Sequence, residues 1–179
     1  VGVETYTRKT FSPERYTIWC ISSSGHNVPL VNGYEQLPGA EHRATDVTYA
    51  SDSDAERLGM NLEGAYPEEA GIQSLRREFA FNRDGTARVT VLDRFALSTG
   101  PVRIAIPLFT PLEVEQLAPG TLALASEPRR LLVRYDPQSV AAKVEGISIE
   151  DERLQASWGS HLNKVTLEHA SDAATGEYS

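Results

Sequence analysis

The sequence has one cysteine, Cys20, among its 179 residues. A single thiol excludes an intrachain disulfide and a cysteine metal cluster. Because Cys20 lies in the apolar run of residues 16–21, we interpret it as a buried thiol, and a reactive nucleophile is the alternative. With no disulfide framework to indicate an oxidising environment, the compartment stays open.

Long apolar runs are also missing. No run approaches the roughly 20 residues that a membrane-spanning helix needs, and no signal peptide is visible. The formal net charge is −8, and a surface of that sign repels polyanions at long range. The balance counts against nucleic acid or an anionic membrane as the main partner. It leaves room for a local basic patch, and the short clusters Arg8-Lys9 and Arg129-Arg130 are solvated turn positions or polysaccharide contacts.

Familiar catalytic motifs are absent from the sequence. There is no Ser/His/Asp signature, no phosphate-binding loop, no dinucleotide fingerprint and no HExxH. Four histidines occur, and no two are spaced like a zinc pair on one helix or hairpin: His26, His42, His161 and His169. Judged by spacing alone, each is a surface histidine or one whose hydrogen bonds are satisfied within the fold.

Alternation of apolar and polar residues dominates what is present. Residues 86–97 and 72–81 each place apolar side chains on one parity, and residues 82–85 between them end in the turn pair Asp84-Gly85. This pattern predicts a long antiparallel hairpin. Asp93 lies on its apolar parity, where a carboxylate is costly unless paired, so we expect an ion pair with one of three arginines: Arg76, Arg77 or Arg94.

Turn signals recur at short, even intervals along the rest of the chain. They predict an all-β fold of antiparallel stacked sheets, a β-sandwich or supersandwich. Pro107 and Pro111 should end a strand or mark an edge, and residues 53–62 are interpreted as a loop. Further strands are predicted at residues 15–22, 28–31, 43–50, 102–109, 121–125, 130–135, 142–149, 154–158 and 162–168.

We expect one domain over residues 1–170, with a possible sub-boundary near 117–120 and a flexible tail at 171–179. The opening residues have no initiator Met and read like the middle of a folded domain. The chain is therefore expected to be a piece of a longer protein.

One block of the sequence resembles a known family. A small, flexible stretch at residues 22–25 leads into His26-Asn27, then into an apolar run and the turn Asn32-Gly33. This order resembles the heparinase II/III-like polysaccharide lyases, and shorter stretches match the same family pattern: residues 2–6, 32–36, 65–67, 76–77, 91–94 and 158–159. The resemblance covers most of the chain. The part of such enzymes that the chain resembles is their carboxy-terminal sheet region.

The resemblance implies a fold, a chemistry and a partner. Such lyases join an amino-terminal α/α toroid to antiparallel sheets and cleave acidic, uronic-acid polysaccharides by β-elimination, using a base and an acid that are commonly tyrosine and histidine. A zinc ion sits in their sheet region on two histidines and an aspartate. His26 matches one of those ligands, and the aspartate is expected immediately before Val1. The zinc site is thus expected to be incomplete here, with no cofactor bound by this chain alone.

Tyr16 matches a stretch where relatives place a catalytic tyrosine. The alternative is that Tyr16 packs with Ile18 and Cys20 on one face of a strand. The hypothesis with most support from the sequence is a non-catalytic part of a lyase that supplies a cleft wall and one metal ligand. A self-standing carbohydrate-binding module and a purely structural sandwich are the alternatives.

Overall fold

The computed structural model describes residues 4–83, 85 and 87–179 of the chain. The backbone is 51% strand and 14% helix, and the strands of the described residues form three antiparallel sheets. The predicted all-β sandwich fold is therefore confirmed. No helix in this described part has the length and apolar character to cross a membrane.

The chain divides into two compact units. Unit 1 holds residues 1–35 and 104–169, and unit 2 holds residues 36–103 and 170–179. Residues 117–120, where the sequence places a possible boundary, include the turn of a hairpin inside unit 1, with Ala118 paired to Thr121. The chain passes from one unit to the other after residues 35, 103 and 169. A single domain over residues 1–170 stays a prediction.

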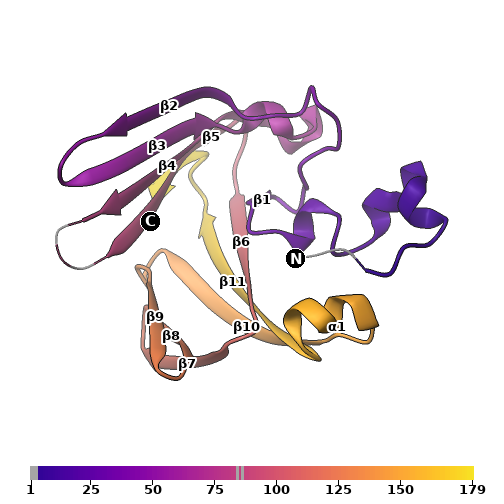
Figure 1. The fold of residues 1–179 in the computed structure, drawn as a ribbon. Coiled ribbons are helices and arrows are strands. Elements are labelled where there is room, and N and C mark those ends of the chain that lie inside the picture. Colours follow the sequence, from indigo (N-terminus) through magenta and orange to yellow (C-terminus); the bar gives the residue numbers. More distant parts are fainter. Residues whose placement is uncertain (1–3, 84, 86) are drawn as a thin grey trace. The chain divides into compact units, whose positions relative to one another are not determined.

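Unit 2 is built on a five-stranded sheet of order β12-β5-β4-β3-β2 (Figure 1). The predicted hairpin forms its centre: Leu75 lies opposite Phe95 and Phe79 opposite Val91. The predicted turn includes Asp84, which lies outside the described residues. The elements of the unit are β2 (Thr45–Ser51), β3 (Ala55–Asn61), η4 (Glu63–Ala65), η5 (Glu68–Ala70), β4 (Ile72–Asn82), β5 (Arg88–Leu97) and β12 (Thr175–Tyr178).

Asp93 is buried at the centre of this sheet and pairs with Arg77, one of the three predicted partners. The Arg77 guanidinium donates from Nε to Oδ1 and from Nη2 to Oδ2 of Asp93, each over 2.7 Å. Such a two-pronged arrangement satisfies both oxygens of a carboxylate that would otherwise be costly to bury. Tyr178 lies opposite Asp93 on β12, and burial together with the nearby Asp93 charge raises the pKa of its phenol.

Unit 1 contains two sheets, of order β1-β6-β11-β10 and β7-β8-β9. Their facing sides bury Leu122 and Leu124 of the second sheet against Val165 of the first, the core expected of a sandwich. The elements are η1 (Lys9–Phe11), η2 (Pro13–Thr17), η3 (Ser23–Gly25), β1 (Leu30–Val31), β6 (Val102–Thr110), β7 (Glu113–Ala118), β8 (Thr121–Ser126), β9 (Arg129–Arg134), β10 (Val140–Ser148), α1 (Glu152–Trp158) and β11 (His161–Ser171).

A second apolar cluster of unit 1 surrounds Cys20. The thiol is buried with Leu154 and Leu162, and burial raises its pKa. The interpretation of Cys20 as a buried thiol is confirmed. Pro107 lies inside β6 but beyond the two residues that pair with β1, which are Ile104 and Ala105, so its missing N–H costs that ladder no bond.

Three predicted elements are wrong. Residues 15–22 form no strand, because Ser12 caps the 3₁₀ turn η2, its hydroxyl accepting from the Glu14 N–H, and Pro13 follows at the first helical position. Residues 53–62 are not a loop: β3 pairs with β4 over seven positions. Residues 154–158 belong to α1, whose first turn is capped by the Asp151 carboxylate accepting from the Arg153 and Leu154 N–H groups.

The end of the chain also differs from its expectation. Residues 171–179, predicted to be a flexible tail, contain β12, which pairs with β5 from Thr175 to Tyr178. The Tyr178 ring is buried, with its centroid 6.4 Å from that of Phe95. A buried aromatic near the last residue closes one edge of the five-stranded sheet, a role that a tail of small polar residues does not signal.

We expect Asp93→Ala to lower the free energy of unfolding by about 3–5 kcal/mol, because it leaves the buried Arg77 charge uncompensated. Glu177→Ala is the control, since it removes a carboxylate from an exposed ion pair with Arg94 and should change stability little. Urea unfolding followed by circular dichroism measures both. Equal effects of the two changes would contradict the assigned role of the pair.

Candidate functional site

The sequence-predicted site residues lie in the first 35 residues of unit 1. Tyr16 belongs to η2, and His26 follows η3 directly as its C-terminal cap. In the described part of the chain, no hydrogen bond or ring contact joins the two side chains. The structure therefore places both residues in unit 1 without linking them directly.

Tyr16 is exposed rather than packed. Its exposed fraction is 46%, against 1% for Cys20, and the Arg15 guanidinium lies 5.6 Å from the centre of its ring. The alternative in which Tyr16 packs beside Ile18 and Cys20 on a strand is wrong, because the segment is helical at Tyr16. Its phenol is accessible to another molecule.

His26 is held in place by its backbone neighbours. Its N–H donates to the Ser23 carbonyl over 3.0 Å. A Cβ on Gly25 would lie 2.1 Å from the Trp19 carbonyl oxygen, so only glycine fits there. On the other side, the Asn27 Oδ1 accepts from the Phe109 N–H over 3.2 Å, which ties the segment to β6. The imidazole itself is exposed.

The turn after His26 is joined to the serine stretch before it. The Glu35 carboxylate accepts from the Ser24 N–H and from the Ser23 hydroxyl, each over 3.2 Å. Asn32 and Gly33 both adopt positive φ, 49° and 83°, which fits the tight turn predicted at this pair. The block of the resemblance that contains His26 thus forms one connected loop, from the serines before it to Glu35 after it.

The electrostatics of His26 favour the neutral ring. The pKa of its imidazole is lowered, first because nearby protein atoms partly desolvate the ring, with the Cys20 backbone opposing the shift. A lowered pKa keeps the imidazole neutral at pH 7, which is the form that binds metal ions. His26 alone does not fit zinc, however: within residues 4–83, 85 and 87–179, no three side chains of histidine, cysteine, aspartate or glutamate gather as a metal cluster.

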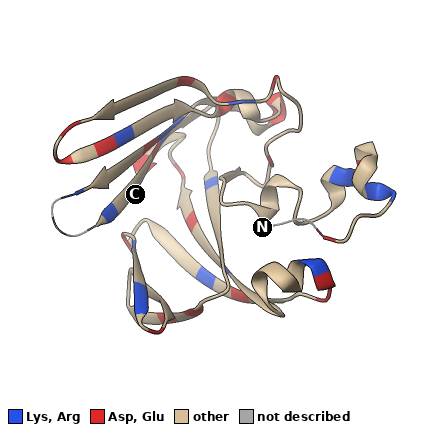
Figure 2. Cartoon of the chain, in the orientation of Figure 1, with Lys and Arg blue, Asp and Glu red and all other residues tan. Residues whose placement is uncertain are grey.

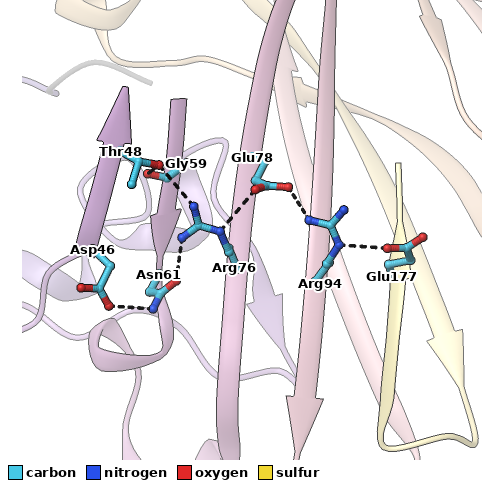
Figure 3. A network of polar contacts seen from close by, with 8 residues as sticks. All are labelled: Asp46, Thr48, Gly59, Asn61, Arg76, Glu78, Arg94 and Glu177. Carbon is cyan, nitrogen blue, oxygen red and sulfur yellow. Dashed lines mark hydrogen bonds and ion pairs between the residues drawn. The ribbon is translucent and has the colours of Figure 1, made fainter. Parts of the chain in front are cut away.

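A polar network crosses one face of the unit 2 sheet (Figure 3), and the pattern of the sequence did not predict it. Arg76 donates to Asn61 over 3.1 Å and to Glu78 over 3.3 Å, and Glu78 also accepts from Arg94. The network ends in Asp46 on β2 and Glu177 on β12. Because Arg76 and Arg94 are both satisfied by carboxylates, they are not the partners of Asp93.

The opposite face of the same sheet carries apolar side chains. Tyr49, Leu58, Phe79 and Val91 lie directly opposite one another across β2, β3, β4 and β5. The next row contains Phe81 and Val89, whose side chains are 38% and 61% exposed. Tyr49 in the first row is 68% exposed, so large apolar side chains of both rows face solvent. Cross-strand register brought these rows together, which is information that separate strand patterns do not contain.

Tyr49 is oriented at the margin of these rows. Its hydroxyl donates to the Glu56 carboxylate, which also accepts from Arg83. The Tyr49 hydrogen bond is the first cause of a lowered Glu56 pKa. The hydrogen bond to Glu56 therefore orients the exposed Tyr49 ring beside the apolar rows.

Comparison with known proteins identifies the fold. No protein-family model matches the sequence, and no curated protein matches it. Among solved structures, the fold is that of a part of a heparan sulfate lyase. The particular match is the crystal structure of heparan sulfate lyase HepC from Pedobacter heparinus, with a TM-score of 0.69 and 12% identity over 99% of this chain. A mutant of that lyase matches with a TM-score of 0.67 and 11% identity.

The match has a definite extent. This chain spans 26% of the length of the HepC chain. At such low identity the likeness is one of fold, and at that level it confirms the resemblance to heparinase-like lyases that the residues around His26 indicate. The catalytic role of Tyr16 and the metal-ligand role of His26 stay predictions.

We expect Gly25→Ala to destabilise unit 1 by about 1–3 kcal/mol, because the new Cβ collides with the Trp19 backbone. Gly64→Ala is the matched control: its Cβ would lie 3.7 Å from the nearest atom, the Arg43 carbonyl oxygen. Urea unfolding followed by far-ultraviolet circular dichroism measures both variants. If Gly25→Ala unfolded like the control, the tight packing under His26 would be disproved.

Proposed function

We propose that this chain is the sheet part of a polysaccharide lyase and that it acts together with a catalytic α/α toroid encoded upstream. The observation that carries the proposal is the structural match over 99% of this chain to 26% of a heparan sulfate lyase. A chain that reproduces one part of such an enzyme is expected to make the same kind of contribution. Its substrate class is an acidic, uronic-acid polysaccharide.

β-Elimination needs a base to remove the C5 proton, an acid to protonate the leaving oxygen and a group that stabilises the uronate carboxylate. These groups must be held in one cleft. From this chain, Tyr16 is the candidate catalytic residue, and its exposed phenol is available to exchange a proton. In our proposal the chain supplies one wall of the cleft, and the remaining groups come from the toroid.

His26 is proposed as one ligand of a structural zinc ion in the longer protein. Zinc at such a site requires about four ligands that converge from preformed structure, and the described residues of this chain supply His26 alone. The other ligands belong to the sequence upstream of Val1. The loop from Gly25 to Asn27 supports the proposal, because its contacts hold the His26 backbone in place while the imidazole stays exposed to a metal ion.

The experiment uses the protein extended by the coding sequence upstream of Val1. We expect His26→Ala to remove stoichiometric zinc and to lower lyase turnover, measured as unsaturated-product absorbance with heparan sulfate and other uronic-acid polysaccharides. His42→Ala serves as the control, since His42 lies in unit 2 and its imidazole lies 3.8 Å from the Glu41 carboxylate. The 179-residue chain alone should show neither turnover nor retained zinc.

Two results would oppose this proposal. Retention of zinc by the His26→Ala variant of the longer protein would remove His26 from the metal site. Turnover by the 179-residue chain itself would show that the catalytic groups are complete without a toroid.

A second candidate function is a carbohydrate-binding module. It is favoured by the exposed Tyr49 ring, which Glu56 holds beside the apolar row of Leu58 and Phe79. An exposed aromatic ring with polar atoms beside it suits the mixed character of a sugar ring, which offers both apolar C–H faces and hydroxyl groups.

For this second candidate, Tyr49→Ala should weaken glycan binding about tenfold, the usual scale for a stacked aromatic anchor. Tyr6→Ala is the control, because Tyr6 is 52% exposed but lies in unit 1. Isothermal titration of the 179-residue chain with neutral and uronic-acid oligosaccharides decides the matter. Unchanged affinity of the Tyr49→Ala variant would eliminate the platform.

A further inference from the structure

Strand β9 concentrates positive charge at one edge of a sheet. Its six residues, Arg129 to Arg134, include three arginines, and Figure 2 shows this basic stretch in blue. In the described residues β9 pairs with β8 alone, so its other backbone edge is open. This local charge stands out in a chain whose formal net charge is −8.

The guanidinium groups of β9 are poorly satisfied within the chain. Arg129 and Arg134 are exposed, and in the part that the structure describes neither side chain forms a hydrogen bond or an ion pair. Arg130 lies 3.7 Å from Glu115, with half of its side chain exposed. That separation is too long for a hydrogen bond, and an exposed pair of this kind contributes little.

The arginines of the five-stranded sheet contrast with those of β9. Arg57, Arg76, Arg77 and Arg94 each have a carboxylate within 3.3 Å. Guanidinium groups in unit 2 are thus largely committed to partners in the same sheet. Those of β9 keep their donors available to a ligand.

The surroundings of β9 leave these groups accessible. Arg130, Leu132 and Arg134 share one face of the strand, and Arg130 and Arg134 are about 13 Å apart at about 3.3 Å per residue. The facing positions on β8 are small, namely Ala125, Ala123 and Thr121. Glu113 and Glu115 lie one strand further, on β7, and the Glu115 carboxylate comes within 3.7 Å of Arg130 without a hydrogen bond.

We infer that β9 is a binding edge for an acidic glycan, contacted through Arg130 and Arg134 on one face of the strand and through Arg129 on the other. Planar guanidinium groups bind sulfate and carboxylate oxygens through paired hydrogen bonds. Spaced arginines along an extended strand suit a linear ligand with repeated anionic groups. The inference rests on the proposed function for the identity of the ligand, and it adds a binding surface separate from Tyr16 and His26.

The test is isothermal titration of the 179-residue chain with size-defined heparan sulfate oligosaccharides, at low and at physiological salt. Replacing all three arginines with glutamine should weaken binding at least about tenfold, since charge-assisted hydrogen bonds contribute more than neutral ones. It should also flatten the salt dependence, because fewer counterions are released. Circular dichroism confirms that the variant is folded.

The control is the triple variant Arg43→Gln, Arg57→Gln and Arg88→Gln in unit 2. Each triple variant changes the formal net charge from −8 to −11, that is −8 − 3, so a loss confined to the β9 variant supports a local site. Equal losses in both variants, or no loss in either, would overturn the inference. So would equal binding of a neutral oligosaccharide, or of a single-stranded DNA of the same charge. The His26 measurement does not involve β9, so each idea can fail separately.

Discussion

The buried ion pair of Arg77 and Asp93 is the constraint on which unit 2 depends. Two hydrogen bonds of 2.7 Å join β4 to β5 at one position, and a slip of one residue would turn every side chain to the other face. A slip would also leave a guanidinium and a carboxylate buried without partners, which is far more costly than the loss of an apolar contact. The pair therefore selects one register among those that alternation alone would permit.

That register creates the two contrasting faces of the sheet. With Arg77 opposite Asp93, Arg76 and Glu78 fall on the face of the polar network, where Arg94 and Glu177 complete the series of charges. The same register aligns the apolar rows on the opposite face. The composition of both faces at β4 and β5 thus follows from the position of one buried charge pair.

Alternation predicted the central hairpin and a short list of partners for Asp93, and an apolar run predicted the buried Cys20, because each depends on local pattern or on the cost of burying a charge. It missed β3, where Gly59 breaks the pattern: a Cβ there would lie 2.5 Å from Arg76 Nη2, a constraint visible only across strands. It misassigned α1 and η2, although Asp151 and the Ser12-Pro13 pair are recognisable helix starts. For the candidate site, the residues around His26 indicated a loop but not which contacts fix it.

The contacts around His26 explain how one residue can be exposed and yet precisely placed by the chain. Backbone packing at Gly25 and the bond from Phe109 to Asn27 hold the loop, so no other side chain has to cover the imidazole. Such a loop presents a ligand without completing a site. In the proposed lyase, the remaining zinc ligands and catalytic groups come from other parts of the longer protein. This chain holds His26 in place and does not supply the full set of reacting groups. An exposed histidine on a held backbone loop and an open basic edge on β9 are both features that need a second component to act.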